Sequence, residues 1–215
     1  MTAGAPRRYD GLLIDAGGVL TTDIFTAFDA HCERIGLEGF SFRELYFGSP
    51  EAQALLHRLE IGEIDADAAE PELARLLGVG GDRAQELFRG LHRDVAYVPE
   101  MTHAVQTLRD RGIRTGLLSN SWWYPFYETP LFAGAFDVKV ISGRVGIRKP
   151  QRAIFERGID ALRVAPHRIV FVDDFTENLV PARELGMAVV LHDPAAPQAT
   201  LAALERLFGV DLLGG

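Results

Sequence analysis

The chain has 215 residues, of which 47% are hydrophobic and 24% are charged, a composition ordinary for a soluble globular protein. This length is enough for one domain, or for a core with a smaller inserted domain. The formal net charge of −8 argues against nonspecific nucleic-acid binding, which requires a basic surface. It leaves an anionic substrate open, because a cleft on an acidic protein can be locally positive.

Cysteine content and targeting signals point to the cytoplasm. The single cysteine, Cys32, cannot form an intramolecular disulfide, which suits a reducing compartment. Two arginines lie in residues 1–8, but Asp15 interrupts the apolar run that follows, so we expect no signal peptide. No stretch has the apolar length of a membrane span. We expect a cytoplasmic protein that binds neither membrane nor nucleic acid, as a monomer or a homodimer.

The first predicted strand ends in a carboxylate. An apolar run, Leu12–Ile14, leads into Asp15, and Gly17 and Gly18 follow. A short apolar run bounded by glycine predicts a buried parallel strand, and ligands bind at the carboxyl ends of such strands. The glycines allow a tight turn and a close approach of the backbone to whatever Asp15 holds. The alternative is a strand that merely ends in an Asp-Gly-Gly turn.

Residues 22–97 are predicted to form a helical block. Leucines recur at helical spacing through this segment, glycines punctuate it, and none of it has the alternation of a strand. Its length of roughly 75 residues is that of a small domain.

From Val98 onwards, helices and strands alternate. The predicted helices include one that starts with Pro150 at its first position and one over Asn178–Leu185 with Pro181 in its first turn. The predicted strands are 113–118, 138–141, 168–172 and 188–191.

This alternation predicts an α/β fold: a Rossmann-like parallel sheet with helices on both faces. The first strand needs this sheet for its pairing, so the helical block is an insertion. We expect a catalytic core of residues 1–21 and 98–215, and an inserted helical cap domain of residues 22–97.

Three predicted strands end in polar residues, which a parallel sheet brings to one edge. These are Asp15, the pair Ser119-Asn120 and the pair Asp173-Asp174; Lys149 precedes a helix near the same edge. Carboxylate oxygens suit Mg²⁺, while a lysine ammonium and a serine hydroxyl suit phosphoryl oxygens. Asp15 is either a metal ligand or a nucleophile that forms an aspartyl-phosphate. Each residue alone has an ordinary structural explanation, as a helix cap, a turn or a solvated side chain, but their joint placement favours a site.

Four segments that carry these residues resemble the motifs of the haloacid dehalogenase-like hydrolases: Asp15–Leu20, Leu118–Asn120, Arg148–Pro150 and Phe171–Asp174. The resemblance covers nearly the whole chain, including the insertion after the first motif. It is greatest to the branch that contains the N-terminal phosphatase domain of soluble epoxide hydrolase and related sugar-phosphate phosphatases. Further segments similar to that branch are Ser119–Trp122, Val145–Pro150, Asn178–Gly186 and Leu59–Ile64.

The resemblance implies a role for each site residue. Asp15 would be the nucleophile and a Mg²⁺ ligand, and Gly17 would offer its backbone carbonyl to the metal. Ser119 and Asn120 would hold the phosphoryl oxygens, and Lys149 would bridge the phosphoryl group and Asp15. Asp174 would be the principal acidic metal ligand of the last motif, with Asp173 beside it and Asn178 in support.

Gly17 departs from the family pattern. Most phosphatases of the superfamily carry a second aspartate at this position, two residues after the nucleophile, to protonate the leaving group. Loss of a general acid costs on the order of 10²–10⁴ in rate, although a leaving group of low pKa needs less help. The dehalogenases of the superfamily lack this aspartate too, but they need no metal, and the Asp173-Asp174 pair favours one.

The resulting hypothesis is a Mg²⁺-dependent phosphatase that hydrolyses a small phosphorylated metabolite through an aspartyl-phosphate on Asp15. One alternative is a phosphate-ligand-binding protein whose catalysis is impaired at Gly17, and a further one is a 2-haloacid dehalogenase. The aromatic run Trp122–Tyr127 is expected to line the substrate entrance, to form a dimer contact or to pack a loop against the cap. The substrate itself is not readable from the sequence.

Overall fold

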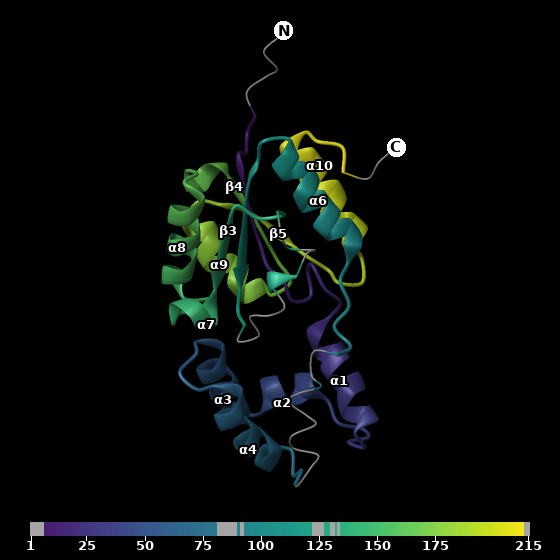
Figure 1. The fold of residues 1–215 in the computed structure, drawn as a ribbon. Coiled ribbons are helices and arrows are strands. Elements are labelled where there is room, and N and C mark those ends of the chain that lie inside the picture. Colours follow the sequence, from purple (N-terminus) through teal and green to yellow (C-terminus); the bar gives the residue numbers. More distant parts are fainter. Residues whose placement is uncertain are drawn as a thin grey trace.

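The protein is described by a computed structural model, which describes residues 7–80, 90, 93–121, 127–129, 132 and 134–212. Its centre is a parallel sheet of five strands in the order β3-β2-β1-β4-β5 (Figure 1). The strands are β1 (Gly11–Ile14), β2 (Arg114–Ser119), β3 (Val138–Ile141), β4 (Ile169–Asp173) and β5 (Ala188–Leu191). The predicted α/β fold is confirmed, and two strands, β3 and β5, have the predicted bounds.

The pleat of the strands sends side chains to two different cores. Leu12 and Ile14 of β1 belong to one cluster, while Leu13 between them belongs to the other. The first cluster is covered by α6 (Pro99–Asp110) and α10 (Pro197–Phe208), and the second by α8 (Arg152–Leu162) and α9 (Thr176–Glu184). Between these covered faces, β1 and β4 are buried over their whole length.

In the described part of the chain, four helices follow β1 and pack around a third, separate apolar cluster. They are α1 (Ile24–Arg34), α2 (Phe42–Gly48), α3 (Pro50–Glu60) and α4 (Ala66–Leu76). All four begin at a Ser or Asp side chain that accepts a hydrogen bond from a first-turn backbone N–H, an aspartate at α1 and α4 and a serine at α2 and α3. In Figure 1 these helices lie beyond one end of the sheet.

The two ends of this helical segment lie side by side. Thr21 and Tyr97 form an isolated antiparallel bridge, and hydrogen bonds join Thr22 N to Ala96 O and Val98 N to Leu20 O. The segment therefore leaves and rejoins the sheet at one place. The proposed domain bounds at 21/22 and 97/98 coincide with this bridge.

Two prolines lie elsewhere than predicted. Pro150 does not start a helix: α8 begins at Arg152, because residues 148–151 form a separate turn in which Gln151 N donates to Arg148 O. Pro181 lies in the second turn of its helix, because α9 begins at Thr176, two residues before the predicted start. The remaining described elements are the short α7 (Ser142–Val145) and the 3₁₀ turn η2 (Pro166–Arg168). Within the described ranges, every helix is too short or too polar to cross a bilayer.

Candidate active site

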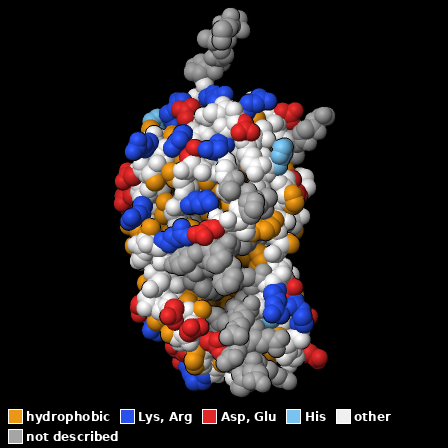
Figure 2. Space-filling model, in the orientation of Figure 1, with side chains coloured by type: hydrophobic (Ala, Val, Ile, Leu, Met, Phe, Trp, Pro, Cys, Tyr) orange, Lys and Arg blue, Asp and Glu red, His pale blue; other side chains and the backbone are white. Residues whose placement is uncertain are grey.

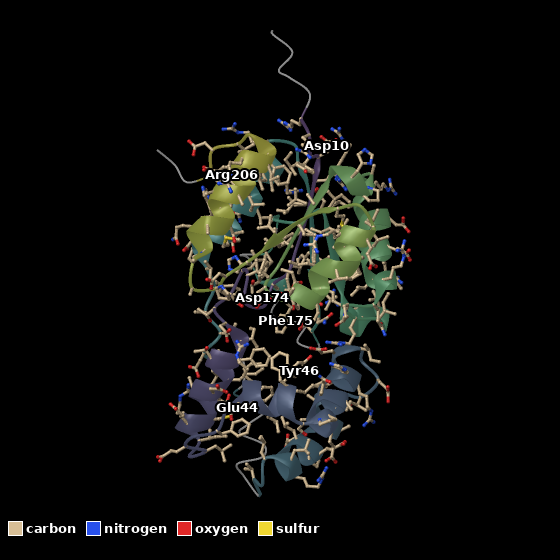
Figure 3. The ribbon with its side chains drawn as sticks, turned by 180° about the vertical axis from the view of Figure 1, so that it is seen from behind. Asp10, Glu44, Tyr46, Asp174, Phe175 and Arg206 are labelled. Carbon is tan, nitrogen blue, oxygen red and sulfur yellow. The ribbon has the colours of Figure 1, made fainter. Side chains whose placement is uncertain are left out.

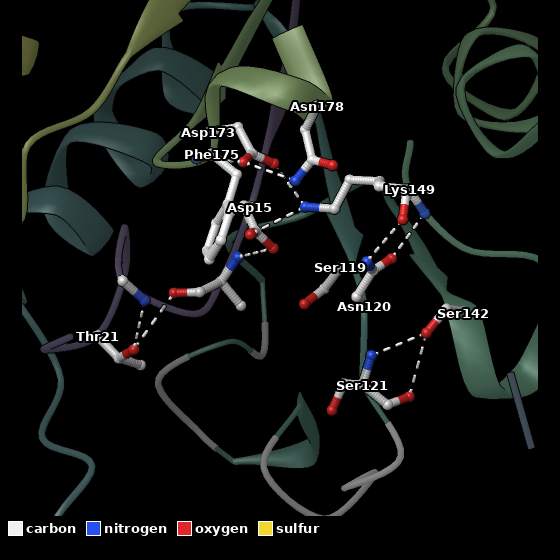
Figure 4. Close-up of polar contacts among 12 residues, drawn as sticks. Asp15, Thr21, Ser119, Asn120, Ser121, Ser142, Lys149, Asp173, Phe175 and Asn178 are labelled. Carbon is white, nitrogen blue, oxygen red and sulfur yellow. Dashed lines mark hydrogen bonds and ion pairs between the residues drawn. The ribbon is translucent and has the colours of Figure 1, made fainter. Parts of the chain in front are cut away.

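The predicted polar strand ends meet at one edge of the sheet. Asp15 follows β1, the central strand, while Ser119 ends β2 and Asp173 ends β4 on either side of it. Asp15 is buried, and its Oδ1 accepts a hydrogen bond of 2.7 Å from Ala16 N. The turn that follows is closed by Thr21, whose Oγ1 accepts from Gly18 N (Figure 4). The edge that faces the helical segment therefore carries the site.

Lys149 lies between two carboxylates. Its Nζ is 2.9 Å from Asp15 Oδ2 and 2.6 Å from Asp173 Oδ2, and the lysine side chain is fully buried (Figure 4). Burial lowers the pKa of Lys149, but the attraction of the two carboxylates outweighs burial and raises the pKa overall. Burial also raises the pKa of Asp15 to about 6, against the opposing effect of Lys149. A cation held at this point restrains and polarises the Asp15 carboxylate.

Asn120 positions the lysine through the backbone. The Nδ2 atom of Asn120 donates to Lys149 O at 3.0 Å, and Lys149 N donates to Asn120 Oδ1 at 2.8 Å. Both polar ends of the amide side chain are thus engaged with a residue 29 positions away. This pairing uses one of the two N–H groups of Nδ2, so a contact of Asn120 with a phosphoryl oxygen would come from the other or from the backbone N–H.

The two aspartates after β4 differ in their surroundings. Asp173 accepts three hydrogen bonds, from Lys149 Nζ, Phe175 N and Asn178 Nδ2. Asp174 Oδ1 is buried and accepts no hydrogen bond within the described part of the chain. Burial, together with the charges of Asp15 and Asp173, raises the pKa of Asp174 to about 8. A buried carboxylate oxygen without a donor is costly unless a cation faces it.

These carboxylates have the spacing of a metal site. One oxygen each from Asp15, Asp173 and Asp174 lie within 4.8 Å of one another. Hard carboxylate oxygens with room for water are the ligands that Mg²⁺ prefers. The orphaned Oδ1 of Asp174 and the oxygen-only donor set both fit such an ion.

Ser119 contacts the hydroxyl group of Tyr127, a pairing that the sequence does not indicate. Its Oγ lies 2.9 Å from the hydroxyl oxygen of Tyr127, and both residues are buried. Burial raises the pKa of Tyr127 to about 12. Tyr127 is the described member of the aromatic run after β2; Trp122–Phe126 lie outside the described residues, so their predicted roles stay predictions.

A cavity of about 440 Å³ opens from these residues towards the helical segment. This volume is within the range of small-molecule sites. Asp15, Gly17, Ser119, Lys149 and Asp174 line its floor at the sheet edge, and residues of α1, α2 and α3 line its other side. Figure 3 shows Tyr46 on the helical side opposite Asp174 and Phe175 on the sheet side.

A buried ion pair joins the two sides of the cavity. Arg148 Nε lies 2.6 Å from Glu60 Oε2, with both side chains less than 15% exposed. Arg148 also donates to Tyr46 OH, which in turn lies 3.1 Å from His57 Nε2. Burial, and then the positive charge of Arg148, lower the pKa of His57 to about 4. The sequence singles out the segments that contain Arg148 and Glu60 but predicts neither their pairing nor the contact with Tyr46, because residues that pair across 88 positions leave no local pattern.

A second contact fixes the same end of α3 to the sheet. Ser142 Oγ donates to Glu60 O at 2.6 Å and accepts from Ser121 N at 2.8 Å. A Cβ atom at Gly62 would lie 2.6 Å from Gly143 O, so the backbones approach closely there.

On the face that Figure 2 shows, acidic and basic side chains are interspersed over both parts of the molecule.

Comparison with known families identifies the family of the chain. A model of the haloacid dehalogenase-like hydrolases matches residues 9–186, most of the chain. The chain belongs to this family of hydrolases. The resemblance of the four motifs is thereby confirmed, and the enzyme class with it.

Individual haloacid dehalogenase-like relatives agree with this assignment. Bifunctional epoxide hydrolase 2 of Sus scrofa is 34% identical over 120 residues, which are 53% of this chain but only 21% of that relative. The sesquiterpene phosphatase astK of Aspergillus oryzae is 28% identical over 159 residues, 71% of this chain and 78% of that protein.

A solved structure shares the fold. A haloacid dehalogenase family enzyme of Bacteroides thetaiotaomicron, determined as a magnesium complex, superposes with a TM-score of 0.72 at 19% identity. The superposition covers 91% of this chain and 99% of that chain.

Proposed function

We propose that this hydrolase is a Mg²⁺-dependent phosphomonoesterase in which Asp15 is the nucleophile. The observation that carries the proposal is the position of Asp15, with Lys149 Nζ 2.9 Å from one carboxylate oxygen and the orphaned Asp174 Oδ1 in the same cluster. Phosphoryl transfer depends mainly on positioning and charge neutralisation, which this arrangement can supply. The sesquiterpene phosphatase among the relatives supports this choice.

Each step uses a residue at the floor of the cavity. The Asp15 carboxylate attacks phosphorus, the bond from phosphorus to the leaving oxygen breaks, and an aspartyl-phosphate results. Water then attacks phosphorus, which releases inorganic phosphate and restores the carboxylate. Ser119 Oγ, the backbone N–H of Asn120 and Lys149 Nζ hold the phosphoryl oxygens, and Lys149 keeps Asp15 oriented.

Asp15, Asp174 and the backbone carbonyl of Gly17 would hold Mg²⁺, with Asp173 beside them. When bound, the ion supplies positive charge next to the phosphoryl oxygens. The 2-haloacid dehalogenase alternative is not favoured, because that chemistry gives the cluster of three aspartates no role.

We also propose that residues 22–97 form a cap over a core of residues 1–21 and 98–215. The Thr21–Tyr97 bridge and the separate apolar cluster of α1–α4 support this division. The cavity between the two parts is then the substrate site.

A second candidate is a phosphate-binding protein without turnover, which Gly17 favours because it removes the usual acid. Release of inorganic phosphate from a panel of phosphomonoesters, with Mg²⁺ and with chelator, separates the two. The phosphatase proposal expects Mg²⁺-dependent release that Asp15→Asn abolishes and that Asp160→Asn, on the exposed face of α8, leaves unchanged. Mg²⁺-dependent stabilisation by phosphate without any turnover would favour the binding protein.

A further inference from the structure

We propose that the substrate is an aryl phosphate, a phosphomonoester of a hydroxyl group on an apolar aromatic ring; this inference rests on the proposed phosphatase function. Two independent features lead to it. One is the aromatic lining of the cavity above Asp15, and the other is the replacement of the usual acid by Gly17 and Ile24.

The cavity is lined with aromatic rings from both parts of the molecule. Phe25 and Phe47 from the helical side each lie 6.2 Å, centroid to centroid, from Phe175, which follows Asp174 directly. Tyr46 packs against both Phe25 and Phe47, at 5.6 and 5.0 Å. Phe47 is nonetheless 54% exposed, although it is a large apolar side chain. An apolar ring in the cavity would cover this surface and pack against the rings at their preferred distances.

The two buried charged groups that line the cavity between the helical segment and the sheet are paired with each other. Glu60 and Arg148 neutralise one another at 2.6 Å, and the pKa of His57 is lowered, so its ring is neutral near pH 7. On the helical side the cavity is mostly apolar, with Gln53, Tyr46 and His57 as its uncharged polar side chains. A sugar or nucleotide would bring many polar groups there, and each one buried without a partner would cost roughly 1–3 kcal/mol. The lining thus favours an apolar leaving group.

The acid position is filled by an apolar side chain. A Cβ atom at Gly17 would lie 3.0 Å from Ile24 Cγ1, so Ile24 occupies the space through which an acidic side chain at position 17 would extend. The other carboxyls of the described lining are committed or peripheral: Asp174 faces the proposed metal, Glu60 pairs with Arg148, and Glu177 is solvent-exposed.

An aryl leaving group needs no acid. When Asp15 attacks, the bond between phosphorus and the aryl oxygen breaks, and its electron pair leaves on oxygen as a phenolate, which later takes a proton from water. A phenolic hydroxyl has a pKa of about 10, against about 15.7 for water, and aliphatic alcohols resemble water in this respect. The leaving group that fits the lining is thus also one that departs unprotonated.

The test compares leaving groups of similar size and different pKa. We expect kcat/KM for phenyl phosphate to exceed that for cyclohexyl phosphate by at least roughly 100-fold, the contribution that a general acid would otherwise make. Acetyl phosphate, a small substrate whose leaving group also needs no acid, reports phosphatase activity by itself. Turnover of acetyl phosphate with equal rates for phenyl and cyclohexyl phosphate would overturn this inference and leave the phosphatase proposal standing. No turnover of any of the three would overturn the phosphatase proposal.

Variants test the two features separately. Phe47→Ala is expected to lower kcat/KM for 2-naphthyl phosphate roughly 10-fold more than for acetyl phosphate, because only the former uses the rings. Gly17→Asp combined with Ile24→Ala is expected to speed cyclohexyl phosphate hydrolysis and so narrow the phenyl-to-cyclohexyl ratio. If Glu60→Gln or Glu177→Gln instead slows cyclohexyl phosphate selectively, that carboxyl is the acid and the inference is wrong. The ratio of kcat/KM for phenyl and cyclohexyl phosphate in the wild type tests the inference even if the double variant does not fold.

Discussion

The Cα atom of Gly18 lies directly against the carboxylate of Asp174. Gly18 has a φ of +69°, and a Cβ atom added there would overlap Oδ2 of Asp174. The position therefore requires glycine twice, for its backbone conformation and for the close approach. The turn after β1 and the acidic pair after β4 fit together only without a side chain at residue 18.

Gly18→Ala should therefore displace the Asp174 carboxylate, in addition to straining the backbone at a positive φ. We expect Mg²⁺ affinity, measured by titration calorimetry, to fall at least roughly 10-fold, the effect typical of disturbing a ligand's support. Gly39→Ala is the matched control, because Gly39 has a φ of +75° and nothing within 4 Å of the added atom. Equal Mg²⁺ affinity in the two variants would show that Asp174 does not hold the metal.

Lys149→Met should unbalance the buried charges. It leaves the carboxylates of Asp15 and Asp173 without their shared cation, and breaking a buried pair costs about 3–5 kcal/mol. In urea denaturation, Asp173→Asn added to Lys149→Met should recover part of this loss, because it removes one unpaired charge. Both Lys149→Met and the double variant should be inactive. If the stability losses of the two single variants simply add in the double variant, the assigned charge balance is wrong.

The Arg148–Glu60 pair should hold the helical segment against the sheet. We expect Glu60→Gln to reduce the free energy of unfolding by about 3 kcal/mol, since it leaves a buried guanidinium uncompensated. Glu156→Gln makes the same substitution in an exposed pair with Arg152, where the expected loss is about 0.5 kcal/mol or less. Similar losses in the two variants would argue against a structural role for the pair.

His57 should make stability depend on pH. Its folded-state pKa of about 4 lies below its ordinary value of 6.5. Between pH 4 and pH 6.5 the unfolded chain therefore binds more protons at this residue than the folded chain does. The contribution of neutral His57 to stability is complete above pH 6.5 and is lost as the pH falls towards 4. His57→Gln should lessen the loss of stability between pH 7 and 5 in denaturant titrations. His103→Gln, on the exposed face of α6, should not.

The strands were predictable because they are short, mainly apolar runs between helices and turns. β1 and β4 are fully buried, and β3 and β5, although partly exposed, have the predicted bounds. The errors at Pro150 and Pro181 concern helix starts, which depend on distant partners. Asn120, 29 residues away, fixes the backbone of Lys149 and with it the turn that precedes α8.

The floor of the site was predictable and its walls were not. Asp15, Ser119 and Asp173 end strands, so topology alone brings them together. The contact of Phe175 with Phe25 and Phe47 and the pairing of Arg148 with Glu60 depend on how the helical segment sits on the sheet. No periodicity within a segment encodes such contacts.

Trapping the phosphorylated enzyme tests the central claim most directly. Acid quenching during Mg²⁺-dependent turnover of phenyl phosphate, followed by borohydride reduction and peptide mass spectrometry, locates any acyl-phosphate. We predict reduction of Asp15 to homoserine in the wild type, and no such product in Asp15→Asn or without substrate. Steady turnover with Asp15 unmodified, or modification at another residue, would contradict Asp15 as the nucleophile.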